Sequence, residues 1–294
     1  MAASYRHPEY LTSANALADL IARAEPRLRI YDCTVYLKPD PPRYRIESGL
    51  ATYLESHVPS AQFLDLPGAL SDAKSPFAFT LPKPAALEAA FRAAGIDDDS
   101  RVVLYSKGHA MWATRVWWML HSAGHAHVSV LDGGFAAWQA AGGAIETGAA
   151  RARPNGTTTV RFRPELWADK AAVRTATNAV SACTINALSR GVYAGTSETS
   201  YGRKGHIPGS RNVYYDSVLA DGKFRSADEI RAAFDAVGAL DGRRIITYCG
   251  GGISATIDSF ALKLIGVDDV AVYDGSMSEW AADATLPLTL GESP

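Results

Sequence analysis

The chain has 294 residues, a length that predicts two domains at roughly 100 to 200 residues per domain. With 47% hydrophobic and 20% charged residues, the composition is that of a globular protein and excludes disorder, collagen and coiled coil. The formal net charge of -2 leaves no overall positive field that would draw the protein to nucleic acid or to an anionic membrane.

The three cysteines, Cys33, Cys183 and Cys249, are too few and too scattered for a disulfide framework or a structural zinc site. Their small number favours a reducing compartment. Charged residues and Pro8 interrupt the apolar positions of residues 1–20, so neither a signal-peptide core nor a membrane span can be drawn there. We therefore expect a soluble, cytoplasmic protein.

The first predicted elements are a helix over residues 14–24, capped by Thr12 or Ser13, and a strand over Leu28–Tyr31. Residues 38–80 are rich in proline and polar side chains, which predicts loops and one short helix. Further along, residues 102–105 and 128–131 are short apolar runs that predict buried strands.

Between those two strands the period of the apolar residues changes to that of a helix. One apolar face is formed by Ala113, Val116, Trp117 and Leu120. We expect the tryptophans of this segment to lie in the core or at a domain interface; they are Trp112, Trp117 and Trp118. Arg115 on the same helix is expected to pair with a carboxylate at the domain interface.

The second half of the chain repeats the first. Residues 101–120 align with residues 244–263, which places Ser106 over Cys249 at a separation of 143 residues. LDGGFAAW likewise aligns with YDGSMSEW, and the segment from His57 aligns with the segment from His206. This repeat indicates a tandem duplication.

Two strands and a helix are predicted again in the second copy. The strands cover residues 245–248 and 270–273, and the apolar helix face consists of Ile257, Phe260, Ala261 and Leu264. Strands that alternate with helices predict a parallel sheet in each half. We place the domains at 1–148 and 164–294, and the linker, which is rich in Gly, Thr, Arg and Pro, at 149–163.

The segment after the predicted strand 245–248 contains Cys249, three glycines, Ile253 and Ser254, and it leads into a helix. At the carboxyl end of a parallel strand, a glycine-rich turn points backbone N–H groups into one cavity, and the helix N-terminus adds partial positive charge. A cysteine at the start of this loop is held as a thiolate and becomes a nucleophile. We predict Cys249 as the catalytic residue, and an anion-binding loop formed by Gly250, Gly251, Gly252, Ile253 and Ser254. We expect Cys33 and Cys183, which lack this context, to be core residues.

Several motifs in order carry a family resemblance: LRIYDCTVYL, ESHVPSAQFLD, ATRVWWML with LDGGFAAW, GRKGHIPGSRNV, and YCGGGISAT with YDGSMSEW. Together they resemble the tandem-domain rhodanese-like sulfurtransferases, which include thiosulfate sulfurtransferase and 3-mercaptopyruvate sulfurtransferase. The resemblance implies an α/β fold of two tandem rhodanese-like domains, each a small, mainly parallel sheet covered by helices. It also implies a catalytically silent N-terminal domain, because Ser106 stands at the Cys position.

The implied activity is sulfur transfer through Cys249. The thiolate takes a sulfane sulfur from 3-mercaptopyruvate or thiosulfate, becomes a persulfide, and passes the sulfur to cyanide or a thiol. A thioredoxin-like protein is one candidate acceptor, and no metal or organic cofactor is required.

The chain departs from the family pattern around the donor. The loop carries no basic side chain, and Gly251 stands where the mercaptopyruvate enzymes have a serine. The family's Asp-Ala-Arg, whose Arg binds the donor's carboxylate, is aligned with Ser181-Ala182-Cys183. The remaining candidates for donor binding are Arg203, Lys204 and His57, and a loop without side chains favours 3-mercaptopyruvate over thiosulfate. The alternatives are a solvated charge for Arg203 and a structural role for His57 like the one expected for His206.

The sequence has two alternative functional interpretations. A protein phosphatase also uses a cysteine at a strand-to-helix loop, but it needs an arginine six positions later, where this chain has Ala255. A non-enzymatic persulfide carrier or interaction module is the second alternative, and the sequence leaves it open.

Overall fold

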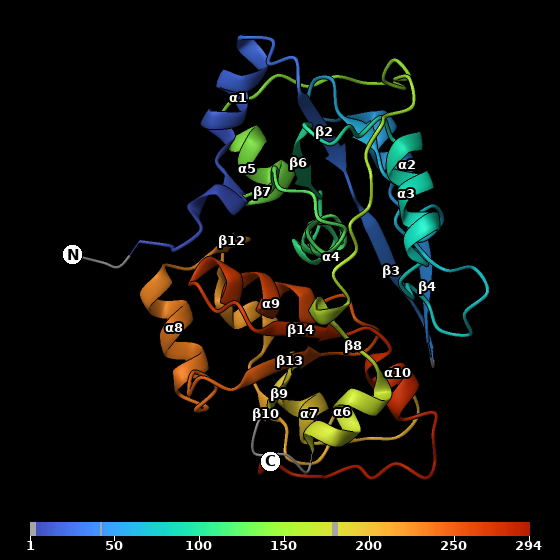
Figure 1. Ribbon diagram of the computed structural model, residues 1–294, viewed down its shortest axis with the longest axis vertical. Coiled ribbons are helices and arrows are strands. Elements are labelled where there is room, and N and C mark those ends of the chain that lie inside the picture. Colours follow the sequence, from blue (N-terminus) through green and yellow to red (C-terminus); the bar gives the residue numbers. More distant parts are fainter. Residues whose placement is uncertain (1–3, 42, 178–181) are drawn as a thin grey trace.

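The computed structural model describes residues 4–41, 43–177 and 182–294, and it folds into two halves that each contain a five-stranded sheet. The N-terminal sheet has the order β1-β7-β6-β2-β5, and all its strand pairs are parallel. Its strands are β1 (Leu11–Thr12), β2 (Leu28–Asp32), β5 (Gln62–Phe63), β6 (Arg101–Tyr105) and β7 (Val128–Leu131). Figure 1 shows the two halves one above the other.

Helices cover both faces of the N-terminal sheet. They are η1 (Pro8–Tyr10), α1 (Ala14–Ala22), α2 (Leu50–Glu55), α3 (Pro84–Ala93), α4 (Met111–Ser122) and α5 (Gly134–Ala140). Helices α1 and α5 share one apolar cluster, and α3 and α4 belong to a larger cluster that continues into the C-terminal half. The predicted first helix and strand are confirmed: Ser13 caps α1 by accepting a hydrogen bond from the Ala16 N–H.

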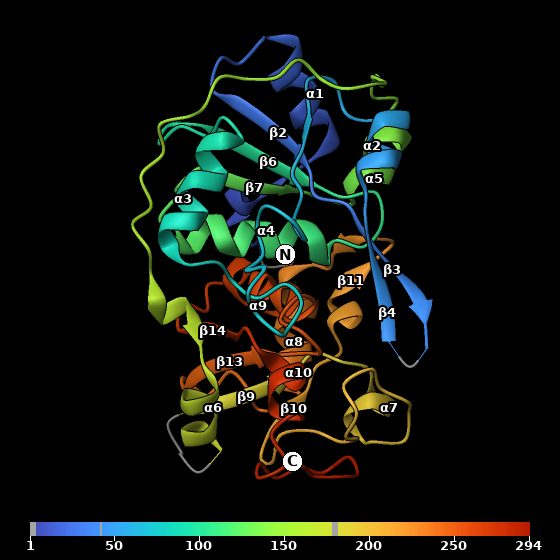
Figure 2. The same cartoon turned by 90° about the vertical axis from the view of Figure 1, so that its right-hand side faces the viewer.

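The expectation for residues 38–80 was wrong in two respects, and one of them is the short parallel strand β5 (Gln62–Phe63). An antiparallel hairpin, β3 (Val35–Asp40) with β4 (Arg43–Ser48), precedes the short helix α2. Figure 2 shows this hairpin projecting from its sheet. Its prolines, Pro39 among them, suggested a loop, but a two-stranded ribbon with open edges tolerates proline at positions that need no ladder hydrogen bond.

The C-terminal half repeats the same plan. Its parallel sheet has the order β10-β9-β13-β14-β8. The strands are β8 (Trp167–Ala168), β9 (Ala182–Asn186), β10 (Arg211–Asn212), β13 (Arg244–Tyr248) and β14 (Val270–Tyr273). The helices are η2 (Pro164–Leu166), α6 (Lys170–Ala176), α7 (Arg190–Tyr193), η3 (Tyr215–Val218), α8 (Ala227–Asp235), α9 (Ala255–Leu264) and α10 (Ser276–Trp280), and a small hairpin joins β11 (Leu219–Ala220) to β12 (Lys223–Phe224). The parallel strands predicted in both halves are confirmed.

Residues 149–163 contain no helix or strand, but they are bound along the N-terminal half. The N–H groups of Gly156, Thr158 and Arg161 donate to the carbonyls of Arg92, Ile96 and Ala123, respectively. Within the described ranges, no helix is both long enough and apolar enough to cross a bilayer.

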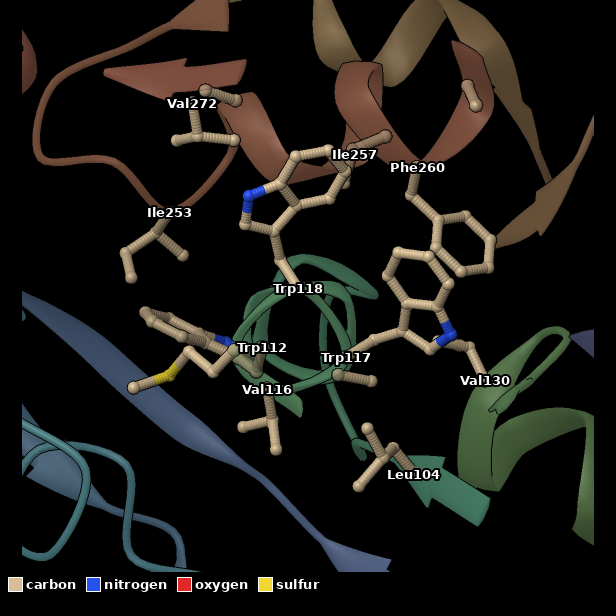
Figure 3. Close-up of a cluster of buried hydrophobic side chains, with 14 of the residues drawn as sticks. Leu104, Trp112, Val116, Trp117, Trp118, Val130, Ile253, Ile257, Phe260 and Val272 are labelled. Atoms are coloured by element: carbon tan, nitrogen blue, oxygen red, sulfur yellow. The ribbon is translucent and has the colours of Figure 1, made fainter. Parts of the chain in front are cut away.

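Helices α4 and α9 pack against each other between the two sheets (Figure 1). The helices α4 and α9 match at a separation of 142 residues, one less than the strands before them, which makes Thr114 and Thr256 equivalent; their hydroxyls lie 2.8 Å apart. Figure 3 shows Trp118 of α4 pointing toward the C-terminal half, with Trp117 beside Phe260. Trp112, Trp117 and Trp118 are all buried, so their predicted core and interface role is confirmed.

Candidate active site

Cys249 lies immediately after β13, at the carboxyl end of a central strand, and α9 begins six residues later. The β-branched residues Ile245, Ile246 and Thr247 place the strand in the core. Only 1% of Cys249 is exposed. The cysteine is therefore held in an enclosed site at the edge of the sheet where ligands bind in open α/β proteins.

The hydroxyl of Ser276 braces the loop from the start of α10. It accepts hydrogen bonds from the N–H groups of Cys249 (3.0 Å) and Gly252 (3.1 Å), and it donates to the Tyr273 carbonyl. The N–H group of Cys249 and one N–H group of the predicted anion-binding loop, that of Gly252, are therefore already occupied.

The N–H groups of the other loop residues remain available. Within the described chain, the N–H groups of Gly250, Gly251, Ile253 and Ser254 donate no hydrogen bond. These free donors, together with the N-terminus of α9, are suited to an anionic sulfur or a donor oxygen.

Contacts with α10 and β14 set the path of the loop. The Met277 and Ser278 N–H groups donate to the carbonyls of Cys249 and Gly250. Gly252 has φ +73°, and a Cβ there would lie 2.5 Å from the Asp274 carbonyl oxygen. Only glycine satisfies both conditions, which explains the third glycine of the run.

Arg115 connects the N-terminal half to this loop. Its guanidinium donates to the carbonyls of Gly252 (3.1 Å) and Phe79 (2.7 Å) and to the Asp274 carboxylate (2.6 Å). The Arg115 side chain is fully buried, and its guanidinium lies 4.8 Å from the ring centre of Trp167. The predicted interface pairing of Arg115 is confirmed, and its partner is Asp274.

Two tyrosines lie beside Cys249. The ring of Tyr201 packs against the loop, 3.7 Å from where a Cβ of Gly250 would be. Burial raises the pKa of Tyr201 above its ordinary value, and so do the neighbouring Tyr248 and Cys249. Burial also raises the pKa of Tyr215, with Cys249 among the weaker causes. Both hydroxyls therefore stay protonated and are able to donate a hydrogen bond.

The predicted donor-binding residues are not brought together at the loop. Arg203 donates to the carbonyls of Ala281, Asp283 and Leu286 at distances of 3.0 Å or less. Its guanidinium thus binds the C-terminal segment, and these contacts do not support the predicted role in donor binding. Lys204 forms an exposed ion pair with Glu198.

His57 and His206 occupy equivalent structural positions. Each ring Nδ1 lies 2.9 Å from a tyrosine carbonyl, that of Tyr53 for His57 and that of Tyr193 for His206. Each ring also stacks on the same tyrosine. The contacts of His57 all lie in the N-terminal half, including Glu146 at 3.8 Å, so its structural alternative is the better supported one.

The alignment of Ser181-Ala182-Cys183 with the family's Asp-Ala-Arg needs correction. Ser181 lies outside the described residues, and Cys183 is buried within β9, opposite Ile245. The strand end is at Asn186, which pairs with Tyr248 as Asp32 pairs with Tyr105.

The turn after each strand supports this register. The side chain of Asn186 accepts from the Leu188 N–H, and that of Asp32 accepts from the Thr34 N–H. With Asn186 at the position of the family's Asp, the family's Arg corresponds to Leu188. The sequence comparison was shifted by five residues because the short apolar strand β9 contains no residue that fixes its register. The inferred lack of that Arg still holds. Cys33 and Cys183 are buried and have raised pKa values because of burial, which confirms their core placement.

Sequence reasoning missed Ser276 and Tyr201. Ser276 is the fourth residue of YDGSMSEW and aligns with Gly134 of LDGGFAAW, so a polar residue in place of glycine was a usable signal. Tyr201 had no comparable signal, because it lies in a segment without a regular period.

The duplicated α/β fold and the buried cysteine at a strand-to-helix loop define the class of protein. A model of the rhodanese-like domain matches residues 13–141 and 195–283. The 3-mercaptopyruvate sulfurtransferase of Escherichia coli K12 is 37% identical over 238 residues, which cover 80% of this chain and 84% of that protein. The mitochondrial thiosulfate/3-mercaptopyruvate sulfurtransferase 1 of Arabidopsis thaliana is 33% identical over 92% of this chain and 76% of that protein.

The crystal structure of SseA, a 3-mercaptopyruvate sulfotransferase from Escherichia coli, superposes with a TM-score of 0.81. That chain is 32% identical, and the match covers 91% of this chain and 98% of SseA. The chain described here belongs to the rhodanese-like family and is a tandem-domain sulfurtransferase.

Proposed function

We propose that Cys249 carries sulfur as a persulfide between a small sulfur donor, 3-mercaptopyruvate or thiosulfate, and a thiophilic acceptor. The observation that carries this proposal is the placement of Cys249 in a loop with free N–H groups at Gly250, Gly251, Ile253 and Ser254. The names of the relatives support the same two donors.

The reaction divides into two displacements. The Cys249 thiolate attacks the outer sulfur of thiosulfate, the sulfur–sulfur bond of the donor breaks, and sulfite leaves with the electron pair. With 3-mercaptopyruvate the carbon–sulfur bond breaks instead, and the thiol proton ends on the methyl carbon of pyruvate. Cyanide or a thiolate then removes the outer sulfur and restores the Cys249 thiolate, with a thioredoxin-like protein as a candidate acceptor.

The N-terminal unit, which we place at 1–148, has a structural role and supplies Arg115 to the loop; residues 149–163 connect it to the catalytic unit, 164–294. We place the enzyme in the cytoplasm, where a reducing environment keeps the thiol of Cys249 free. The three cysteines are unpaired, in keeping with that environment.

The preference for 3-mercaptopyruvate loses the support it took from Arg203, whose donors are engaged elsewhere. The choice of donor is measured directly by kcat/KM for thiosulfate and for 3-mercaptopyruvate with cyanide as acceptor. We expect multiple turnovers with at least one of them, and a mass gain of one sulfur atom on the Cys249 peptide when acceptor is absent. Persulfide formation without turnover by any small donor would favour the carrier instead.

A further inference from the structure

The two halves differ in the segment that precedes the His-Val/Ile-Pro turn. In the N-terminal half the Tyr53 carbonyl meets His57 four residues later. In the C-terminal half the equivalent Tyr193 carbonyl meets His206 thirteen residues later, with the same distance and the same ring stacking. Residues 194–205, called the strap below, are therefore nine residues longer (13 − 4 = 9) than the equivalent segment 54–56 of the N-terminal half.

The strap is bound at both ends. Gly195 and Gly205 have φ values of +78° and +107° and pack against Leu290 and Thr289 of the C-terminal segment. Near its end, Arg203 donates to three carbonyls of residues 281–286. These contacts hold the middle of the strap, including Tyr201, against the catalytic loop.

The Tyr201 hydroxyl is an unused donor. It is buried and has no hydrogen-bond partner among the residues that the structure describes. Its ring lies against Gly250, the residue after the nucleophile. A buried hydroxyl without a partner costs free energy, so its retention at this place calls for an acceptor present in another state of the enzyme.

We propose that the Tyr201 hydroxyl donates a hydrogen bond to the outer sulfur of the Cys249 persulfide. This inference rests on the proposed function. Because Cys249 is 1% exposed, the anionic sulfur that it gains lies inside the protein and needs donors there. The free loop N–H groups supply part of this stabilisation, and Tyr201 supplies a side-chain donor that remains protonated.

The test is the equilibrium of the first half-reaction, in which thiosulfate and the Cys249 thiolate give the persulfide and sulfite. Persulfidated enzyme is titrated with sulfite, and the persulfide fraction is read by intact-protein mass spectrometry. We expect Tyr201→Phe to shift this equilibrium constant toward the free thiolate by about tenfold, the value of one hydrogen bond to a charged group. A merely structural role for Tyr201 would leave this constant unchanged.

Tyr193→Phe is the matched control, because the Tyr193 hydroxyl donates to the Ser210 carbonyl inside the same half. It should lower the unfolding midpoint and leave the equilibrium constant within about twofold of wild type. Arg203→Ala, which releases the strap and leaves Tyr201 intact, should shift the constant in the same direction as Tyr201→Phe by a smaller factor.

A Tyr201→Phe variant with the wild-type equilibrium constant would overturn the inference and leave the proposed function standing. A wild-type enzyme that forms no persulfide with either donor would overturn both. If Tyr201→Phe folds poorly, the equilibrium constant is measured in Arg203→Ala instead. An unchanged constant in Arg203→Ala would then contradict the role of Tyr201.

Discussion

The loops that follow β6 and β13 occupy equivalent places in the two halves, and only one of them is arranged for nucleophilic chemistry. In the silent loop the Ser106 hydroxyl donates to the His109 carbonyl at 2.8 Å. The Lys107 ammonium binds the Thr52 carbonyl and the Ser56 hydroxyl and lies over the Phe135 ring. The catalytic loop has glycines at the positions that follow Cys249, which leaves its N–H groups accessible.

The residues that brace the two loops share a backbone and differ in one side chain. Gly134 and Ser276 both have positive φ values, +57° and +48°, and the residue after each donates its N–H to the carbonyl of Ser106 or Cys249. Only Ser276 adds a hydroxyl that accepts from two loop N–H groups. The duplication thus kept the frame of the site, and a few side chains decide its chemistry.

The interface is symmetric in its backbone contacts and asymmetric in its charge. Asp132 accepts from the Phe224 N–H across the interface, and Asp274 accepts from the Leu81 N–H in the opposite direction. Arg115 reaches the catalytic loop, whereas the equivalent position in α9 is the apolar Ile257. A buried cation therefore supports only the loop that carries Cys249.

The largest expected effect is the loss of the nucleophile. Cys249→Ser should abolish sulfur transfer, because the hydroxyl remains protonated and cannot form a persulfide. Cys33→Ser and Cys183→Ser should keep most of the activity, since both thiols lie in the core. The measurement is steady-state thiocyanate formation, and similar losses in all three variants would contradict the assignment of Cys249.

Removal of the interface cation comes next. Arg115→Ala removes the cationic partner of the Asp274 carboxylate and the donor of two carbonyls, and it should cost about 3–5 kcal/mol of unfolding free energy. Urea unfolding measures this change. Arg45→Ala is the control, because Arg45 is 65% exposed in its pair with Glu47 and should change stability by less than about 0.5 kcal/mol. Equal effects of the two substitutions would show that Arg115 does not hold the halves together.

Two substitutions of Ser276 separate the effect of its hydroxyl from that of its positive φ. Ser276→Ala removes the acceptor of two N–H groups and should lower kcat/KM by about tenfold, equivalent to about 1.4 kcal/mol. Ser276→Gly removes the same hydroxyl but relieves the positive φ, so it should be the more stable variant with a similar loss of activity. Wild-type kcat/KM in both variants would exclude the hydroxyl from the function of the loop.

A smaller effect is expected from Asp258 of α9, whose equivalent in α4 is Val116. Burial raises the pKa of Asp258 well above its ordinary value, and neither carboxyl oxygen has a hydrogen-bond partner within the described ranges. The native state therefore keeps this proton, while the unfolded chain releases it above about pH 4, so wild-type stability falls as the pH rises.

Asp258→Val removes the ionisable group and with it the decrease of stability at higher pH. Its unfolding free energy should exceed that of wild type by an amount that grows from about pH 5 to pH 8. Chemical unfolding at several pH values measures the difference. A difference that is the same at all pH values would mean that Asp258 does not titrate differently in the native and unfolded states.

The smallest effect is expected when a cysteine is introduced into the loop after β6. Ser106→Cys in a Cys249→Ser background should form no persulfide, because Lys107-Gly108-His109 replaces the three glycines and Gly134 provides no brace. Mass spectrometry after incubation with thiosulfate is the test. Clear accumulation of persulfide on residue 106 would mean that the backbone frame alone is sufficient.

The sequence by itself determined the duplication and the parallel strands, and it predicted the nucleophile. These features depend on local patterns, such as the β-branched run before Cys249 and the glycines after it, which have the same conformational meaning in most contexts. The pairing of Arg115 with a carboxylate was also predictable in kind, since a buried cation requires a partner.

Only the tertiary structure decided which groups meet at the loop. Arg203 lies just before the Gly-His-Ile-Pro-Gly turn in the sequence, but the fold places the carbonyls of Ala281, Asp283 and Leu286 around its guanidinium. Tyr201 reaches Gly250 because the strap is bound at both ends, and the strand register of Asn186 is visible only beside Tyr248. Contacts between residues far apart in the chain depend on loop paths and register, which local composition does not encode.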